Sequence, residues 1–166
     1  MSLRVWFHMV TAVLYFDHNA TTPLLPEARD AWLDASERFV GNPSSPHRLG
    51  QRAEAALQQA REQLATLLGA GPHDIVWTSG ATESNNMVFH HAAGTLSPAA
   101  EVWVSAFEHP CVMAASERYC AGRVRRLPVS DDGVVDVEIL EEQIRRRPPG
   151  LVAVMAANNE TGVLQP

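Results

Sequence analysis

Short apolar runs alternate with longer segments of helical periodicity along this 166-residue sequence, and this alternation constrains the fold more than any other feature. The short runs predict buried strands at residues 75–78, 101–106, 123–129 and 151–157. Apolar residues at helical spacing predict helices at residues 27–39, 48–68, 83–96, 110–121 and 137–147. Strands separated by helices predict an α/β fold, with a mostly parallel, doubly wound sheet flanked by helices.

Residues that favour turns separate these elements. The run VGNPSSPHRLG at residues 40–50 predicts a loop with special backbone angles between the first two helices. Residues 69–72 end the second helix, residues 131–133 form a turn, and residues 148–150 break the last helix. No internal repeat or low-complexity segment interrupts the pattern.

Charge and cysteine content exclude several classes of function. A net charge of −6, with arginine runs only at residues 125–126 and 145–147, argues against nucleic-acid binding. Cys111 and Cys120 are too few for a disulfide framework and predict a reducing, cytoplasmic location. Residues 1–14 lack a strong cationic start and are too short to span a bilayer, which predicts an extended lead-in of uncertain origin and no membrane segment.

Lysine is absent from the sequence, because all 13 basic residues are arginine. A mechanism that needs a lysine amine cannot be completed by this polypeptide alone.

Polar clusters follow three of the predicted strands. They occupy residues 79–82 (Ser-Gly-Ala-Thr), 107–109 (Phe-Glu-His) and 158–162 (Asn-Asn-Glu-Thr-Gly). Ligands of open parallel sheets bind outside the carboxyl ends of the strands. The three clusters are therefore expected to converge on one site.

The first cluster enters a helix through small residues, so backbone N–H groups and the Thr82 hydroxyl can face a phosphate at the positive helix end. It lacks the Gly-Lys-Ser/Thr ending of a Walker loop and the G-x-G-x-x-G of a dinucleotide loop. The alternative is that Ser79 or Thr82 simply caps the helix and Glu83 completes a capping box.

The other clusters offer a proton-transfer group and amides. His109 at a helix start can lie flat against a planar ring or move a proton near neutral pH, and the alternative is a capping histidine. Asn158 and Asn159 can hold a carboxylate or a ring oxygen, and the alternative is a turn built from asparagine and glycine.

Five segments in register resemble one enzyme family: YFDHNATTPLLPEA, GNPSSPHRLGQRA, IVWTSGATESNN, EHPCVMAA and NNETGVLQP. Their order and spacing resemble those of cysteine desulfurases, the NifS/IscS-like pyridoxal-phosphate enzymes of the class V aminotransferase group. The resemblance covers residues 15–166. It implies the N-terminal part of the large domain of a type I pyridoxal-phosphate-dependent transferase, without the C-terminal half of the family.

The resemblance implies roles for individual residues. Ala81 and Thr82 match the positions that bind the cofactor phosphate. His109 matches the catalytic histidine that stacks on the pyridine ring and assists proton transfers. Asn159 matches the asparagine near the phenolic oxygen of the cofactor and the substrate carboxylate.

The family reaction takes sulfur from L-cysteine, leaves alanine, and holds the sulfur as an enzyme persulfide for iron–sulfur cluster assembly. The implied partners are therefore L-cysteine and a sulfur acceptor such as an iron–sulfur scaffold protein, and the implied assembly is a homodimer. No metal ligand is implied.

Two features of the family find no counterpart here. The lysine that links covalently to pyridoxal phosphate lies downstream of the matching segments, and so does the persulfide-forming cysteine. Cys111 and Cys120 do not match that cysteine and are predicted to pack on the inner face of a helix. Residues 15–166 are accordingly expected to be an incomplete portion, inactive alone.

Three alternatives stay open. One is another class V pyridoxal-phosphate enzyme, such as a selenocysteine lyase, and a second is a non-catalytic module that pairs with a full-length relative. The third is a zinc site built from His109, Cys111 and Cys120, with His90 or His91 as a further ligand. The spacing of these residues does not resemble that of structural zinc knuckles.

Overall fold

The computed structural model describes residues 14–166, so the predicted lead-in lies almost entirely outside the described residues. The predicted helices are all confirmed, with ends that differ by no more than two residues from those expected. The elements are α1 (Pro26–Arg38), α2 (Arg48–Leu68), the 3-10 turn η1 (Pro72–Asp74), α3 (Ala81–Thr95), β1 (Val102–Ser105), α4 (Pro110–Cys120), β2 (Val124–Leu127), α5 (Val137–Arg146) and β3 (Leu151–Ala153). Within residues 14–166, no helix combines the length and apolarity needed to cross a bilayer.

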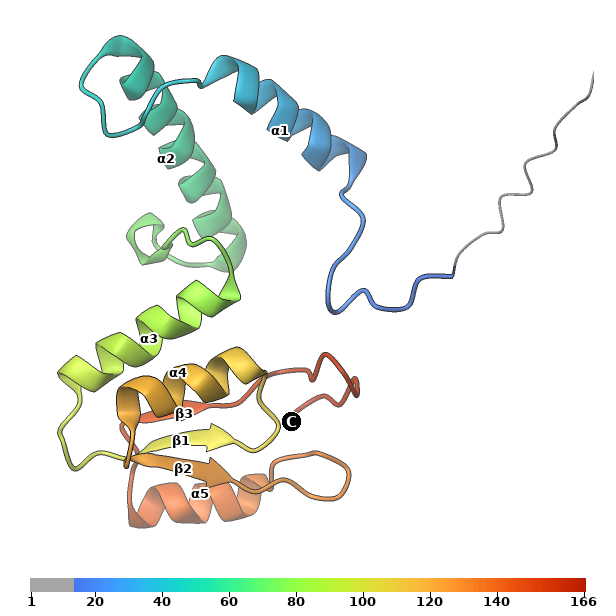
Figure 1. Cartoon of the computed structure of the whole chain (residues 1–166), viewed down its shortest axis with the longest axis vertical. Coiled ribbons are helices and arrows are strands. Elements are labelled where there is room, and N and C mark those ends of the chain that lie inside the picture. The colour runs from blue at the N-terminus through green and yellow to red at the C-terminus, as the bar shows by residue number, and fades with distance from the viewer. Residues whose placement is uncertain (1–13) are drawn as a thin grey trace, which may run out of the picture.

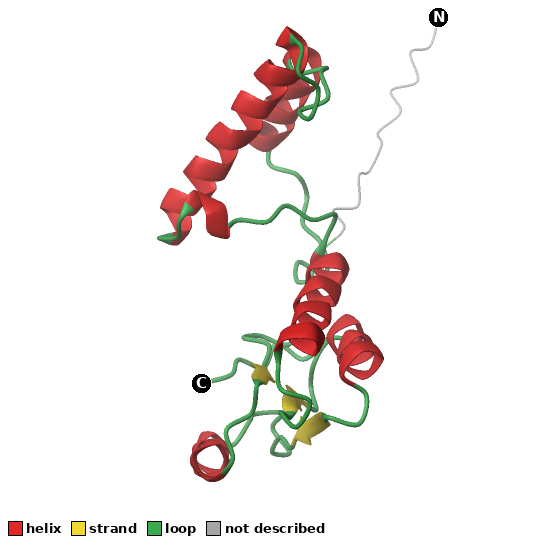
Figure 2. Ribbon diagram, turned by 90° about the vertical axis from the view of Figure 1, so that its left-hand side faces the viewer, coloured by secondary structure: helices red, strands yellow, loops and turns green. Residues whose placement is uncertain are grey.

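The sheet is parallel, with strand order β2-β1-β3. In its register, Val102 of β1 lies opposite Val124 of β2 on one side and Leu151 of β3 on the other. Helices α3 and α4 lie on one face of the sheet and α5 lies on the other (Figure 1), as the turned view also shows (Figure 2). A doubly wound α/β arrangement is confirmed for this part of the chain.

The hydrophobic core lies between the sheet and the α3–α4 layer. Strand β1 is buried at every position, and Val102 and Val104 pack with Phe89 of α3 and Cys120 of α4. Burial of one large apolar side chain contributes about 1.5–3 kcal/mol. Cys120 is fully buried, so its prediction as a packing residue is confirmed.

The predicted strand at residues 75–78 is wrong. The segment is irregular, and the side chains of Val76 and Trp77 are 62% and 43% exposed. Among residues 14–166 no strand lies beside it, and the carbonyl of Ile75 accepts a hydrogen bond from the Arg61 side chain instead. A strand needs a neighbouring ladder, and β-branched composition alone does not supply one.

Strand β3 is shorter than the predicted run 151–157, because it ends at Ala153. The N–H of Met155 donates to the carboxylate of Glu108 rather than to a neighbouring strand. The chain therefore leaves the sheet before it reaches Asn158.

Helix α2 begins where the loop before it folds back onto its first turn. His47 caps the helix, with its Nδ1 accepting from the N–H of Gly50 at 3.3 Å. A Cβ atom on Gly50 would stand 2.2 Å from the carbonyl oxygen of Ser45, so only glycine fits there. The helix ends at Gly69, whose φ of 65° lies in the left-handed region that glycine adopts readily.

Candidate active site

The three polar clusters meet at one cavity of about 650 Å³. Its wall includes Ala81 and Thr82 from the start of α3, His109 from the turn before α4, and Asn159 from the turn after β3. The convergence predicted from the strand ends is confirmed, although the first cluster follows an irregular segment and not a strand. The four site residues named from the sequence all line the same cavity.

The N-terminal end of α3 faces this cavity. Gly80 is the N-cap residue, and the first helical hydrogen bond runs from the N–H of Ser84 to the carbonyl of Gly80 at 3.1 Å. Within residues 14–166, the N–H groups of Ala81 and Thr82 have no hydrogen-bond acceptor. A Cβ atom built on Gly80 would have no neighbour within 4 Å among the described residues, so this part of the structure leaves the helix end open to a ligand.

Glu83 occupies the third position of the helix and binds back to Ser79. Its Oε2 accepts from the Ser79 hydroxyl at 2.6 Å and from the Ser79 N–H at 2.7 Å. The hydroxyl bond, and next the N–H bond, hold the pKa of this carboxyl below its ordinary value, against a small opposing effect of desolvation. The alternative that Ser79 or Thr82 is the N-cap is wrong, but Glu83 does complete the helix start.

His109 caps α4 and also lines the cavity. Its Nδ1 accepts from the N–H of Cys111 at 3.1 Å, and Pro110 supplies the first helical residue. The capping role considered as an alternative is thus confirmed, and it leaves the exposed ring beside the cavity. One residue therefore serves the helix and faces the candidate site.

Cys111 lies in the cavity wall, where sequence reasoning did not place it. Its Sγ is 2.9 Å from Nδ1 of His109 and 3.2 Å from Nδ2 of Asn85. The side chain is half-buried and also packs against the core cluster, so the predicted packing role is only part of its environment. The missed signal was its spacing of two residues from the helix-capping histidine.

The two adjacent asparagines have different environments. Asn158 is buried and holds the turn, since its Oδ1 accepts from the N–H groups of Glu160 and Thr161 at 2.9 and 2.8 Å. The turn-building alternative is therefore confirmed for Asn158. The side chain of Asn159 has no hydrogen-bond partner within residues 14–166 and borders the cavity.

Glu108 joins two of the three turns and was not singled out from the sequence. Its Oε1 accepts from the Ser105 hydroxyl at 3.2 Å and from the N–H of Met155. The carboxylate thus connects the end of β1 to the segment that leads from β3 to Asn159. No periodicity or spacing signals such a contact, because its partners are 47 residues apart.

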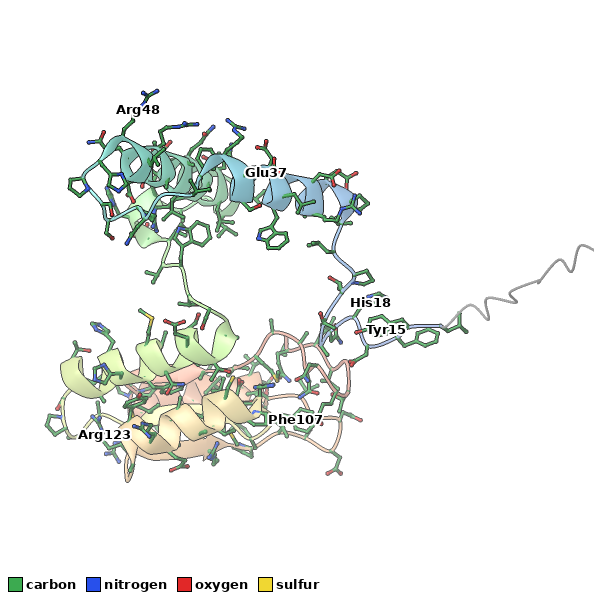
Figure 3. The ribbon with its side chains drawn as sticks, turned by 45° about the horizontal axis from the view of Figure 1, so that its top comes forward. Tyr15, His18, Glu37, Arg48, Phe107 and Arg123 are labelled. Atoms are coloured by element: carbon green, nitrogen blue, oxygen red, sulfur yellow. The ribbon has the colours of Figure 1, made fainter. Side chains whose placement is uncertain are left out.

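The segment before α1 forms a further part of the wall. The Tyr15 hydroxyl donates to the carbonyls of Asp17 and Thr21 at 2.8 and 2.9 Å, closing a loop that brings Asn19 to the cavity. Figure 3 shows Tyr15 and His18 on this segment. The segment is one of the five that carry the family resemblance, but the resemblance implied no site residue in it.

Metal ligation finds no support among the described residues. Within residues 14–166, no group of three or more histidine, cysteine, aspartate or glutamate side chains is arranged to hold a metal ion.

Comparison with known proteins supplies the family context. Residues 14–166 match the family described as Aminotransferase class-V. A cysteine desulfurase of Rattus norvegicus is 43% identical over 157 residues, which cover 92% of this chain and 35% of that protein. A mitochondrial cysteine desulfurase of Arabidopsis thaliana is 43% identical over 160 residues and is covered to 34%. The chain thus spans about a third of the length of these curated relatives.

Solved structures agree with these matches. A NifS-like protein is 34% identical, with a TM-score of 0.81 over 92% of this chain and 43% of that chain. A structure described as SspA in complex with cysteine is 33% identical, with a TM-score of 0.78 over 92% of this chain and 44% of that chain.

Proposed function

This chain belongs to the aminotransferase class-V family, and on that premise we propose that it carries the phosphate-binding part of a pyridoxal-phosphate site for L-cysteine desulfuration. The observation that carries the proposal is the meeting of Ala81, Thr82, His109 and Asn159 at one cavity. These residues come from three segments far apart in the sequence.

The residues of the cavity fit pyridoxal phosphate. The open end of α3 offers the N–H groups of Ala81 and Thr82, with the positive end of the helix dipole, to a phosphate group. The exposed ring of His109 offers a flat surface to a pyridine ring. The side chain of Asn159 offers both a donor and an acceptor to a phenolic oxygen or a carboxylate.

When bound, pyridoxal phosphate supplies the electron sink for bonds broken at the amino-acid carbon. The chain supplies position and proton transfer. Thr82 and the N–H groups beside it would hold the phosphate, His109 would face the ring and move a proton at its Nε2, and Asn159 would orient the L-cysteine carboxylate. His109 is in this proposal the catalytic residue.

The amine that holds the cofactor covalently in this family is not among these 166 residues, because they contain no lysine. Binding by these residues alone is therefore noncovalent. The phosphate also finds no arginine in the cavity wall within residues 14–166, so backbone N–H groups carry its recognition there.

L-cysteine as substrate is supported by relatives named cysteine desulfurase and by the SspA structure, which is described as a complex with cysteine. We propose that the complete site yields alanine and a persulfide that serves iron–sulfur cluster assembly through a scaffold acceptor, in a homodimer. The two free cysteines suit a reducing compartment, for which we propose the cytoplasm, although relatives in Drosophila melanogaster and Arabidopsis thaliana are named as mitochondrial.

The test is a binding titration that follows individual backbone amides by NMR. Pyridoxine 5′-phosphate is the first ligand, because it has the ring and the phosphate but no aldehyde to react with the chain's terminal amine. The amides of Ala81 and Thr82 are expected to shift most, together with the ring of His109.

Substitution separates specific from general binding. Thr82→Val is expected to weaken the affinity about tenfold, the effect of one lost hydrogen bond to a charged group at the lower end of its range. Thr95→Val, at the opposite end of α3, is the matched control and should bind as the wild type does. Equal affinity in wild type and Thr82→Val, or shifts confined to residues outside the cavity, would overturn the proposal.

A further inference from the structure

We propose that Cys111 is a positioning residue for His109, fixing the imidazole as the tautomer that carries its proton on Nε2. The chemical consequence of this arrangement rests on the proposed function, because it concerns the ligand that His109 meets. The tautomer itself is a property of the chain without any ligand.

Two groups of Cys111, its backbone N–H and its thiol, lie within hydrogen-bond distance of the Nδ1 atom of His109. The backbone N–H of Cys111 donates to it at 3.1 Å, and the Sγ of Cys111 lies 2.9 Å away. A ring nitrogen that accepts an N–H carries no proton of its own, so the proton of the neutral ring is on Nε2. The thiol is then the donor in the contact between sulfur and Nδ1.

The sulfur is itself held from a second helix. Nδ2 of Asn85, in α3, donates to Sγ of Cys111 at 3.2 Å. The Cys111 side chain also packs against the core cluster below it, which limits its rotation. Hydrogen bonds therefore run in one direction, from Asn85 to Cys111 to His109, across the interface of α3 and α4.

The direction of these hydrogen bonds determines which form of the His109 ring faces the cavity. Within residues 14–166, Nε2 has no hydrogen-bond partner, and it is the nitrogen left for a ligand. Because it bears the proton, His109 meets the ligand as a hydrogen-bond donor. The atom opposite must then be an acceptor, such as a phenolic or carboxylate oxygen, and not a donor such as an ammonium group.

The experiment measures the imidazole ¹⁵N shifts of His109 in the 166-residue chain without ligand, assigned with His109→Gln. The expected spectrum has a pyridine-type Nδ1 and a pyrrole-type Nε2. Cys111→Ala keeps the backbone donor but loses the thiol, so the ratio of the two tautomers should fall roughly threefold, given that a thiol is a weak donor. Cys111→Ser keeps a donor and should retain the wild-type ratio.

Two further variants keep the test decisive. Cys120→Ala removes the other thiol of α4 and should leave the His109 ratio unchanged. Asn85→Leu leaves Cys111 in place but removes the amide that holds its sulfur, and it should lower the ratio in the same direction as Cys111→Ala. Should Cys111→Ala fail to fold, Asn85→Leu and Cys111→Ser supply the comparison.

A wild-type ring protonated mainly on Nδ1 would overturn the inference, and so would ratios that stay unchanged in both Cys111→Ala and Asn85→Leu. Because these spectra need no ligand, their outcome is separate from that of the pyridoxine phosphate titration. If only the proposed function fails, pyridoxine phosphate does not bind while His109 still carries its proton on Nε2.

Discussion

The Nδ2 atom of Asn158 donates to the carbonyl oxygen of Phe107 at 3.1 Å, across 51 positions of the sequence. Asn159 follows the donor directly, and His109 stands two residues beyond the acceptor. This single contact therefore sets the spacing between two of the four candidate site residues. Glu108 adds a parallel connection through the N–H of Met155.

Replacement of Asn158 by alanine should destabilise the fold by about 2 kcal/mol, because the part-buried hydrogen bonds of this buried side chain with Phe107, Glu160 and Thr161 are lost. Urea unfolding followed by circular dichroism measures this loss. Asn159→Ala is the matched control. Its side chain has no partner within residues 14–166, and its stability should stay within about 0.5 kcal/mol of the wild type. Equal losses in the two variants would contradict the division of roles between them.

Replacement of Gly50 by alanine should cost about 2 kcal/mol or more. The new Cβ would meet the carbonyl oxygens of Ser45 and Asn42 at 2.2 and 2.6 Å, and backbone atoms cannot move aside cheaply. Thermal unfolding measures the change. Gly94→Ala provides the contrast, since its Cβ meets nothing within 4 Å among residues 14–166 and alanine favours the helix by about 1 kcal/mol. A Gly50→Ala variant as stable as Gly94→Ala would show that the loop before α2 does not pack as described.

The helix start at Glu83 should make stability depend on pH. The pKa of Glu83 is lowered in the folded chain, so its carboxylate stabilises the fold fully at any pH above the ordinary pKa of 4.5. This stabilisation is lost as the pH falls below 4.5 and through the lower pKa of the folded state. Unfolding midpoints measured from pH 7 downward should show wild type converging on Glu83→Gln in that acid range. A difference between the two proteins that is independent of pH would rule out the carboxylate as the source.

The purified 166-residue chain, given pyridoxal phosphate and L-cysteine, should release no alanine beyond what free cofactor produces. The reason is the missing lysine amine, not a defect of the cavity. Chromatographic detection of alanine checks this, with the cysteine desulfurase of Rattus norvegicus as the active control. Alanine and sulfide above the background would mean that another amine takes the place of lysine.

Elements whose signals lie in neighbouring residues of the sequence could be predicted. Helix α2 was expected at residues 48–68, because an apolar stripe at helical spacing marks its length and Gly69 marks its end. The structure places the helix at these residues. That His109 and Thr82 line one cavity was expected as well, although the expectation placed Thr82 after a strand that the structure does not form.

Residues that act through distant partners could not be predicted. Residues 75–78 have strand composition, but no strand of the described part of the chain (residues 14–166) lies beside them, and composition does not reveal whether a partner strand exists. The contacts of Glu108 with Met155 and of the Cys111 sulfur with Asn85 join residues that only the folded chain brings near.

The central place of β1 has a consequence for synthesis on the ribosome. Its two neighbours, β2 and β3, both come later in the chain, so a growing polypeptide completes both edges of β1 only after Leu151–Ala153 has left the exit tunnel. The cavity takes longer still, since Phe107 must wait for Asn158 to emerge. In a nascent chain of this protein, one edge of β1 therefore lacks its partner strand for the time needed to translate about fifty codons.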